Sequence, residues 1–222
     1  MNINLIEKLK ENKVFPIIRS GNKQDVIDKV NALLDGAIDI MEINIENTDV
    51  FRAIEAISSE AIICAGGIIT SIQAKAAMDA GAKVISSPIF QSNLLKISKD
   101  KQIPFIAGTS TANEAYNAWK CRIPVVKIYP ITAMGGVQYI ENLLRPMPFL
   151  DIIPQGNVQL SEVQAYIKYG ENNKLMLVAD ILTNKEINNK EDIRETVAAH
   201  CKKSHQPTEC IFKKVSIENS EC

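Results

Sequence analysis

Histidine is scarce in this 222-residue sequence: there are two, His200 and His205, both near the C-terminal end. A Ser-His-Asp triad, a histidine acid/base pair and a His-ligated zinc site all need imidazole inside the folded domain. We therefore expect none of these chemistries and no metal site. A Walker-type phosphate loop and a G-x-G-x-x-G fingerprint are also lacking, which leaves only the weak signals Gly66-Gly67 and Gly135-Gly136.

No sign of charge predominates, because 25 Lys and Arg residues stand against 26 Asp and Glu. Such a chain has no overall field that would draw it to nucleic acid or to an anionic membrane. Long apolar runs are lacking too, since none approaches the ~18 residues of a membrane span. We expect neither a signal peptide nor a membrane segment.

The cysteines are odd in number and widely spaced, at positions Cys64, Cys121, Cys201, Cys210 and Cys222. This spacing matches neither a disulfide framework nor the close pairs of a structural zinc site. A reducing compartment is the simplest location, so we expect a cytoplasmic protein.

Short apolar runs alternate with amphipathic stretches over most of the chain, which is typical of repeated βα units with buried parallel strands. The predicted strands are Val14–Arg19, Ile38–Ile43, Ile62–Ala65, Lys83–Ser87, Phe105–Gly108, Val125–Tyr129, Leu150–Pro154 and Lys174–Val178. The alternation permits a closed barrel or an open doubly wound sheet, and eight units favour a (β/α)8 barrel. We expect residues 1–200 to form this single domain and residues 201–222 to be a tail or an extra surface element.

Helices are predicted between the strands, with apolar residues at three-and-four spacing, over Lys23–Leu34, Val50–Ser58, Ile72–Ala80 and Thr111–Lys120. Three glycines stand where a helix must turn back toward the next strand, Gly36, Gly81 and Gly170. Glycine adopts a positive φ at little cost, so these positions indicate helix ends.

One charged residue, Lys127, lies inside the apolar strand V-V-K-I-Y. A buried ammonium loses solvation, and the neutral amine that burial favours can attack a ketone to form a Schiff base. Alternatively, the side chain points between barrel and helices and reaches water at its end.

Two further charges lie at the barrel face where active sites are found: Glu42 is near the C-terminal end of the second predicted strand, and Arg19 ends the first. Glu42 suits proton transfer beside Lys127, or it caps a loop or pairs with Arg19. Arg19 suits a substrate carboxylate or phosphate, or it is that salt-bridge partner.

A series of blocks in this sequence resembles the class I 2-keto-3-deoxy-6-phosphogluconate (KDPG) and 4-hydroxy-2-oxoglutarate (KHG) aldolases. The similarity spans about Phe15 to Ile181, with blocks in matching order and spacing: P-I-I-R (16–19), M-E-I (41–43), C-A-G-G-I (64–68), S-S-P (86–88), I-P-F-I-A-G-T-S-T (103–111), V-K-I-Y-P (126–130) and G-G-V (135–137).

The resemblance implies a β/α barrel, commonly a homotrimer, with no metal or organic cofactor. It implies that Lys127 forms the Schiff base with pyruvate or the keto acid, that Glu42 shuttles protons, and that Arg19 contacts an anionic part of the substrate. It also places Gly66, Gly67, Pro88, Gly156, Ala179 and Asp180 at substrate-binding positions. The expected reaction cleaves a 4-hydroxy-2-keto acid to pyruvate and an aldehyde.

The sequence departs from the family pattern around the expected substrate. Gly67 stands where relatives carry a threonine, and Glu46 stands where many carry an arginine. The expected phosphate segments read Gln155-Gly156-Asn157 and Ala179-Asp180-Ile181, where a carboxylate would repel phosphate. We therefore expect a preference for an unphosphorylated substrate such as 4-hydroxy-2-oxoglutarate.

The same departures leave open a barrel that binds a keto acid or another small anion, or has a structural role, without turnover. A different phosphate-binding barrel enzyme is disfavoured because the glycines that such a site needs are missing.

Overall fold

A computed structural model of the chain describes residues 7–9, 15–35, 38–158, 162, 165–166 and 169. Its seven strands are β1 (Ile17–Ile18), β2 (Ile40–Asn44), β3 (Ile62–Gly66), β4 (Val84–Ser87), β5 (Phe105–Thr109), β6 (Val126–Ile128) and β7 (Ile152–Pro154). Its helices are α2 (Lys23–Asp35), α3 (Thr48–Ile57), α4 (Ser71–Asp79), α5 (Ser92–Lys101), α6 (Ala112–Lys120) and α7 (Gly136–Leu144), with a 3₁₀ turn at Thr132–Met134.

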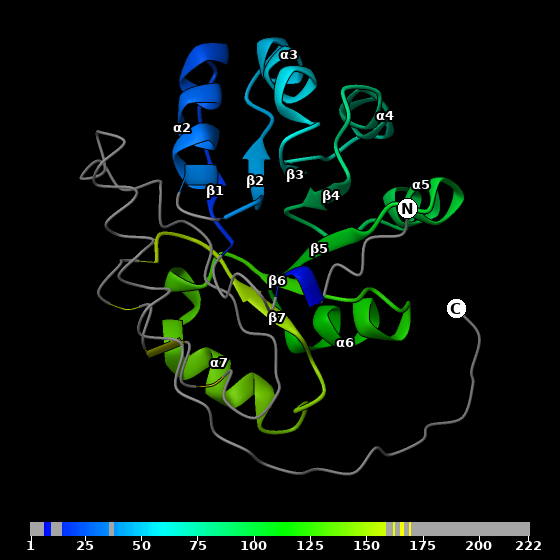
Figure 1. The fold of residues 1–222 in the computed structure, drawn as a ribbon. Helices are drawn as coiled ribbons and strands as arrows, with labels where there is room; N and C mark the ends of the chain where they lie inside the picture. Colours follow the sequence, from blue (N-terminus) through cyan, green and yellow to red (C-terminus); the bar gives the residue numbers. More distant parts are fainter. Residues whose placement is uncertain are drawn as a thin grey trace.

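The strands form one parallel sheet in the order of the sequence, β1 to β7, and the sheet curls with helices along its outer side (Figure 1). Seven of the eight predicted strands are therefore confirmed. The eighth, Lys174–Val178, lies outside the described residues, as does the 201–222 segment. The first strand ends at Ile18, so Arg19 follows the strand that was predicted to include it.

Apolar residues fill both faces of the sheet, as parallel strands require. One set packs between the sheet and the helices, for example Ile18, Met41 and Ile85. The other fills the concave side and consists of Leu9, Phe15, Ile17, Ile40, Cys64, Val84, Ile106, Val125 and Ile153. Side chains of a strand alternate between its faces, so the residue two positions later points to the same side. Glu42, Ser86 and Lys127 each follow an inner apolar residue in this way.

The four predicted helices are confirmed to within two residues at each end. Thr70 and Thr111 are the N-cap residues directly before α4 and α6, and each hydroxyl accepts a hydrogen bond from the main-chain N–H of the third residue on, Gln73 or Glu114, in a capping box. Gly81 has φ 102°, as expected where α4 turns back. Gly36 and Gly170 lie outside the described residues. No helix in the described ranges is long and apolar enough to cross a membrane.

Candidate functional site

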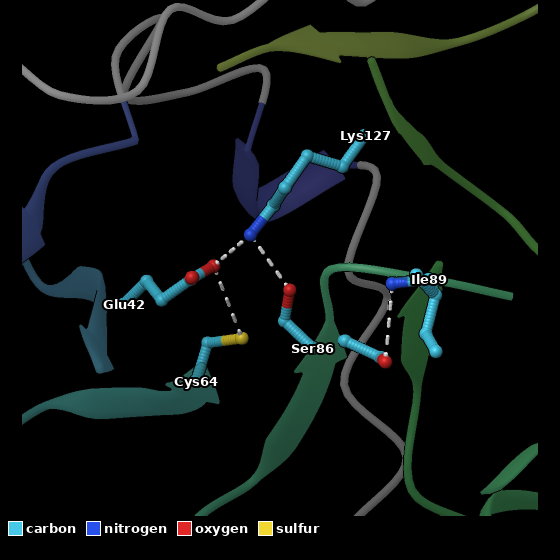
Figure 2. A network of polar contacts seen from close by, with 6 residues as sticks. Glu42, Cys64, Ser86, Ile89 and Lys127 are labelled. Atoms are coloured by element: carbon cyan, nitrogen blue, oxygen red, sulfur yellow. Dashed lines mark hydrogen bonds and ion pairs between the residues drawn. The ribbon is translucent and has the colours of Figure 1, made fainter. Parts of the chain in front are cut away.

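The side chain of Lys127 enters the concave side of the sheet from β6. Its Nζ donates hydrogen bonds to Glu42 Oε2 at 2.5 Å and to Ser86 Oγ at 2.7 Å (Figure 2). Glu42 comes from β2 and Ser86 from β4, so three separate strands meet at one nitrogen. The structure thus brings together two of the three charged residues that the sequence singled out, and adds a hydroxyl.

Lys127 and Glu42 are almost fully buried, with 2% and 1% of their side-chain surfaces exposed. The alternative that Lys127 reaches water at its end is therefore wrong. Two charges removed from water are tolerated only with close pairing and further hydrogen bonds, because desolvation is costly. The 2.5 Å contact and the Ser86 hydroxyl supply both. The result is a nucleophilic amine held beside a carboxylate that can exchange protons with it.

A fourth strand, β3, contributes Cys64 to the same group. Its Sγ lies 4.0 Å from Glu42 Oε2, the oxygen that also accepts from Lys127. Burial raises the pKa of the Cys64 thiol well above its usual value, and the Glu42 carboxylate raises it further. The thiol is therefore a neutral hydrogen-bond donor and a poor nucleophile.

Gly66 leaves the space that the Glu42 side chain occupies. A Cβ on Gly66 would lie 2.2 Å from Glu42 Oε1 and 2.6 Å from Cγ and Cδ. Gly66 follows Cys64 by two residues on β3, so it faces the same interior. Substitution at this position therefore acts on the carboxylate itself.

Pro88 follows β4, where its main chain passes over β5. A Cβ on Gly108 would lie 2.1 Å from the Pro88 carbonyl oxygen, so only glycine permits this approach. Gly108 in turn lies beside Lys127 in the pairing of β5 with β6. The predicted binding residue Pro88 is thus held near the strand that carries the amine.

Arg19 directly follows β1, the first strand of the sheet, whereas Lys127 lies on β6. Its Nη1 is 4.0 Å from Glu46 Oε1, and both side chains are about two-fifths exposed, at 41% and 42%. Glu46 Oε1 also accepts a hydrogen bond from Asn44 Nδ2 at 2.8 Å. The carboxylate paired with Arg19 is therefore Glu46 and not Glu42. An exposed pair at this distance contributes little to stability and leaves the guanidinium able to exchange partners.

Gly67 follows β3 with φ 71°, and a Cβ there would lie 2.8 Å from Asn44 Oδ1. The position therefore disfavours any side chain in its present backbone conformation. Glycine at this position, where a threonine was expected from the resemblance, thus fits the local backbone conformation.

The segment after β7 is joined to the turn after β6. Gly156 has φ 122°, and its carbonyl accepts a hydrogen bond from Thr132 Oγ1 at 2.5 Å. Ile131 N also donates to the Gln155 carbonyl at 2.8 Å. The predicted binding position Gly156 is thus fixed to the end of the strand that carries Lys127. Ala179 and Asp180 lie outside the described residues.

Ser86 is the contact that the sequence did not assign. In the sequence it stood out only as part of the S-S-P block. Side chains alternate between the two faces of a strand, so a hydroxyl two positions after the apolar residue Val84 could have indicated a polar group on the same face. Within the described residues, no group of three or more His, Cys, Asp or Glu side chains is placed to hold a metal ion.

Comparison with known proteins gives a consistent result. Residues 5–199 match the family model of KDPG and KHG aldolase. The 2-dehydro-3-deoxy-phosphogluconate aldolase of Haemophilus influenzae is 29% identical over 166 residues, covering 73% of this chain and 78% of that protein. The KHG/KDPG aldolase of Escherichia coli K12 is 27% identical over 157 residues, covering 69% and 74%.

Among solved structures, the fold is similar to that of the KDPG aldolase of Legionella pneumophila, with a TM-score of 0.79 and 21% identity over 90% of this chain and 98% of that one. That crystal holds pyruvate as a covalent carbinolamine. The 4-hydroxy-2-oxoglutarate aldolase/2-deydro-3-deoxyphosphogluconate aldolase from TTHB1 gives a TM-score of 0.78 at 21% identity, with the same coverage of 90% and 98%.

Proposed function

The chain belongs to the family of KDPG and KHG aldolases, and from this premise we propose that it is a class I aldolase that cleaves a 4-hydroxy-2-keto acid to pyruvate and an aldehyde. The observation that carries the proposal is the buried contact of 2.5 Å between Lys127 Nζ and Glu42 Oε2. An amine and a carboxylate in this arrangement supply both groups that Schiff-base aldol chemistry needs.

The proposed reaction starts when Lys127 passes a proton to Glu42 and attacks the C2 carbonyl of the keto acid. Glu42 returns that proton to the hydroxyl of the carbinolamine, which leaves as water, and the resulting protonated imine withdraws electrons from C3. Glu42 then takes the proton of the C4 hydroxyl, the C3–C4 bond breaks, and the aldehyde leaves. The enamine that remains is protonated at C3, and hydrolysis releases pyruvate and the free amine. The carbinolamine captured in the Legionella pneumophila relative supports the first step.

Arg19, Gly66, Gly67, Pro88 and Gly156 are proposed to line the substrate together with Ala179 and Asp180. Arg19 would hold an anionic group of the substrate by exchanging its exposed partner Glu46. The main chain of Gly66 adjoins Glu42, and Pro88 lies against Gly108 of β5, the strand that pairs with the Lys127 strand. These contacts support the assignment for the described residues.

We further propose that residues 174–178 supply the eighth strand and that residues 1–200 form one closed barrel, with residues 201–222 appended. Seven parallel strands in sequence order and the similarity of the fold to solved aldolase structures support closure. A homotrimer in the cytoplasm, without cofactor, is proposed from the family pattern and from the widely spaced cysteines.

The proposed substrate is unphosphorylated, such as 4-hydroxy-2-oxoglutarate. Support comes from Asp180 and from the single glycine in Gln155-Gly156-Asn157, which make a poor phosphate cradle. The test compares kcat/KM for 4-hydroxy-2-oxoglutarate and KDPG, following pyruvate release, because this ratio reports differential transition-state binding. A higher kcat/KM for KDPG would contradict the substrate assignment while leaving the aldolase assignment intact.

A second candidate is a barrel that binds a keto acid or another small anion without turnover. It is favoured by the departures from the family pattern around the expected substrate, at Gly67, Glu46 and Asp180. Saturable pyruvate binding without pyruvate release from any 4-hydroxy-2-keto acid would establish this candidate and exclude the first.

A further inference from the structure

Ser86 is a third group at the nucleophile. Its side chain is fully buried, and its Oγ accepts a hydrogen bond from Lys127 Nζ at 2.7 Å, separate from the contact of the same nitrogen with Glu42 (Figure 2). We propose that Ser86 is a positioning residue that accepts the last N–H of the Lys127 nitrogen once the Schiff base has formed, and so releases Glu42 for proton transfer with the substrate. This inference rests on the proposed aldolase function.

The count of hydrogens on the nitrogen leads to this role. The Lys127 ammonium carries three N–H groups, and two of them have acceptors, Glu42 Oε2 and Ser86 Oγ. Formation of the protonated imine makes a C=N bond and breaks the C=O bond of the ketone. Two of the three nitrogen protons leave with the ketone oxygen as water. One N–H remains, and it can point to one of the two acceptors.

Glu42 cannot be that acceptor and also act fully as the base. A carboxylate that accepts a hydrogen bond from a positively charged imine is stabilised in its charged form and attracts a further proton less strongly. Ser86 does not compete in this way, because a hydroxyl accepts the N–H and stays neutral. With the N–H on Ser86, the positive charge stays on the imine, where it withdraws electrons, and Glu42 is free to turn toward the C4 hydroxyl.

The neighbouring serine provides a matched control. Ser87 is also fully buried, yet it faces the other side of β4, and its Oγ accepts from the Ile89 main chain at 3.3 Å. Ser86→Ala and Ser87→Ala each remove one buried hydroxyl from adjacent positions. Only the first removes a partner of Lys127.

The experiment measures cleavage kinetics and the trapping of a pyruvate adduct by borohydride in the wild type and in four variants, Ser86→Ala, Ser86→Thr, Ser86→Cys and Ser87→Ala. Ser86→Ala is expected to lower kcat by roughly 10- to 100-fold, the size expected for a hydrogen bond to a charged group, and to change KM by less than about threefold. The adduct should still form. Ser86→Thr keeps the hydroxyl and should recover most of kcat, whereas Ser87→Ala should retain it.

Urea unfolding shows whether each variant is folded. If Ser86→Ala does not fold, Ser86→Cys takes its place, because a thiol is close in size and a poor acceptor. A kcat for the Ser86 variant within about threefold of the wild type would overturn the proposal, and so would equal losses in Ser86→Ala and Ser87→Ala. If the wild type forms no adduct at all, the aldolase assignment itself fails, and the role of Ser86 falls with it.

Discussion

Gly66→Ala is the substitution that addresses the site geometry most directly, because the added methyl group meets the Glu42 carboxylate. The new Cβ would lie 2.2 Å from Glu42 Oε1 and 2.6 Å from Cγ and Cδ, whereas ordinary contact begins at 3.4 Å. Glu42 must therefore move by about 1 Å. It cannot do so without disturbing Oε2, which is held at 2.5 Å from Lys127 Nζ.

Two separate effects are expected from this displacement. Overpacking of a buried interior costs about 1–3 kcal/mol in the free energy of unfolding. A shift of ~1 Å in a reacting group also costs on the order of 10²-fold in rate. Covalent trapping of pyruvate should persist, since Lys127 itself is not displaced by the methyl group.

The assay combines urea unfolding, borohydride trapping and steady-state cleavage of 4-hydroxy-2-oxoglutarate. Gly21→Ala serves as the control, because its Cβ would meet the end of the Asn47 side chain at 2.6 Å, in a loop between β1 and α2. That variant is expected to keep its kcat. Wild-type turnover by Gly66→Ala would refute the reasoning, since it would mean that the position of Glu42 does not set the rate.

Three further outcomes are expected. Glu42→Gln should still form at least part of the pyruvate adduct while cleavage falls by ~10²-fold or more, the usual contribution of an acid/base group; equal turnover would remove Glu42 from the mechanism. The raised pKa of buried Cys64 means that the folded protein keeps a proton that the unfolded thiol releases above about pH 8.5. The free energy of unfolding should therefore fall as pH rises past that point, by up to about 1.4 kcal/mol per pH unit. Urea unfolding at about pH 7.5 and at about pH 9.5 measures this fall, which should be smaller in Cys64→Ala than in the wild type. Thr111→Ala removes the hydroxyl that caps the N-terminus of α6 and should lower the free energy of unfolding in urea by about 1 kcal/mol, with no such loss for Thr111→Ser.

The fold was predictable to the extent that buried parallel strands leave short apolar runs. Seven such runs became strands because each is apolar on both faces. Strand ends were less accurate: the run through Arg19 continues one residue beyond the last residue of β1, because the apolar pattern does not record where ladder hydrogen bonds stop.

Lys127 and Glu42 were singled out from the sequence as charges that an apolar strand cannot easily hold, and the structure brings these two side chains together. These two residues are 85 positions apart in sequence, so no local sequence pattern could predict that their side chains are in contact. Neutral groups gave a weaker signal, so the contacts of Ser86 and Cys64 were not foreseen. Arg19 was predicted inside the first strand but follows it, and its partner Glu46 depends on how the loop after β2 turns.

The central claim is that Lys127 forms the covalent intermediate, and mass spectrometry of the trapped protein tests it most directly. The protein is incubated with pyruvate and borohydride, digested, and compared with Lys127→Met treated in the same way. A pyruvate-sized mass on the peptide that contains Lys127, absent from the variant, is the predicted result. A label on any other lysine, or no label on the wild-type protein, would contradict it.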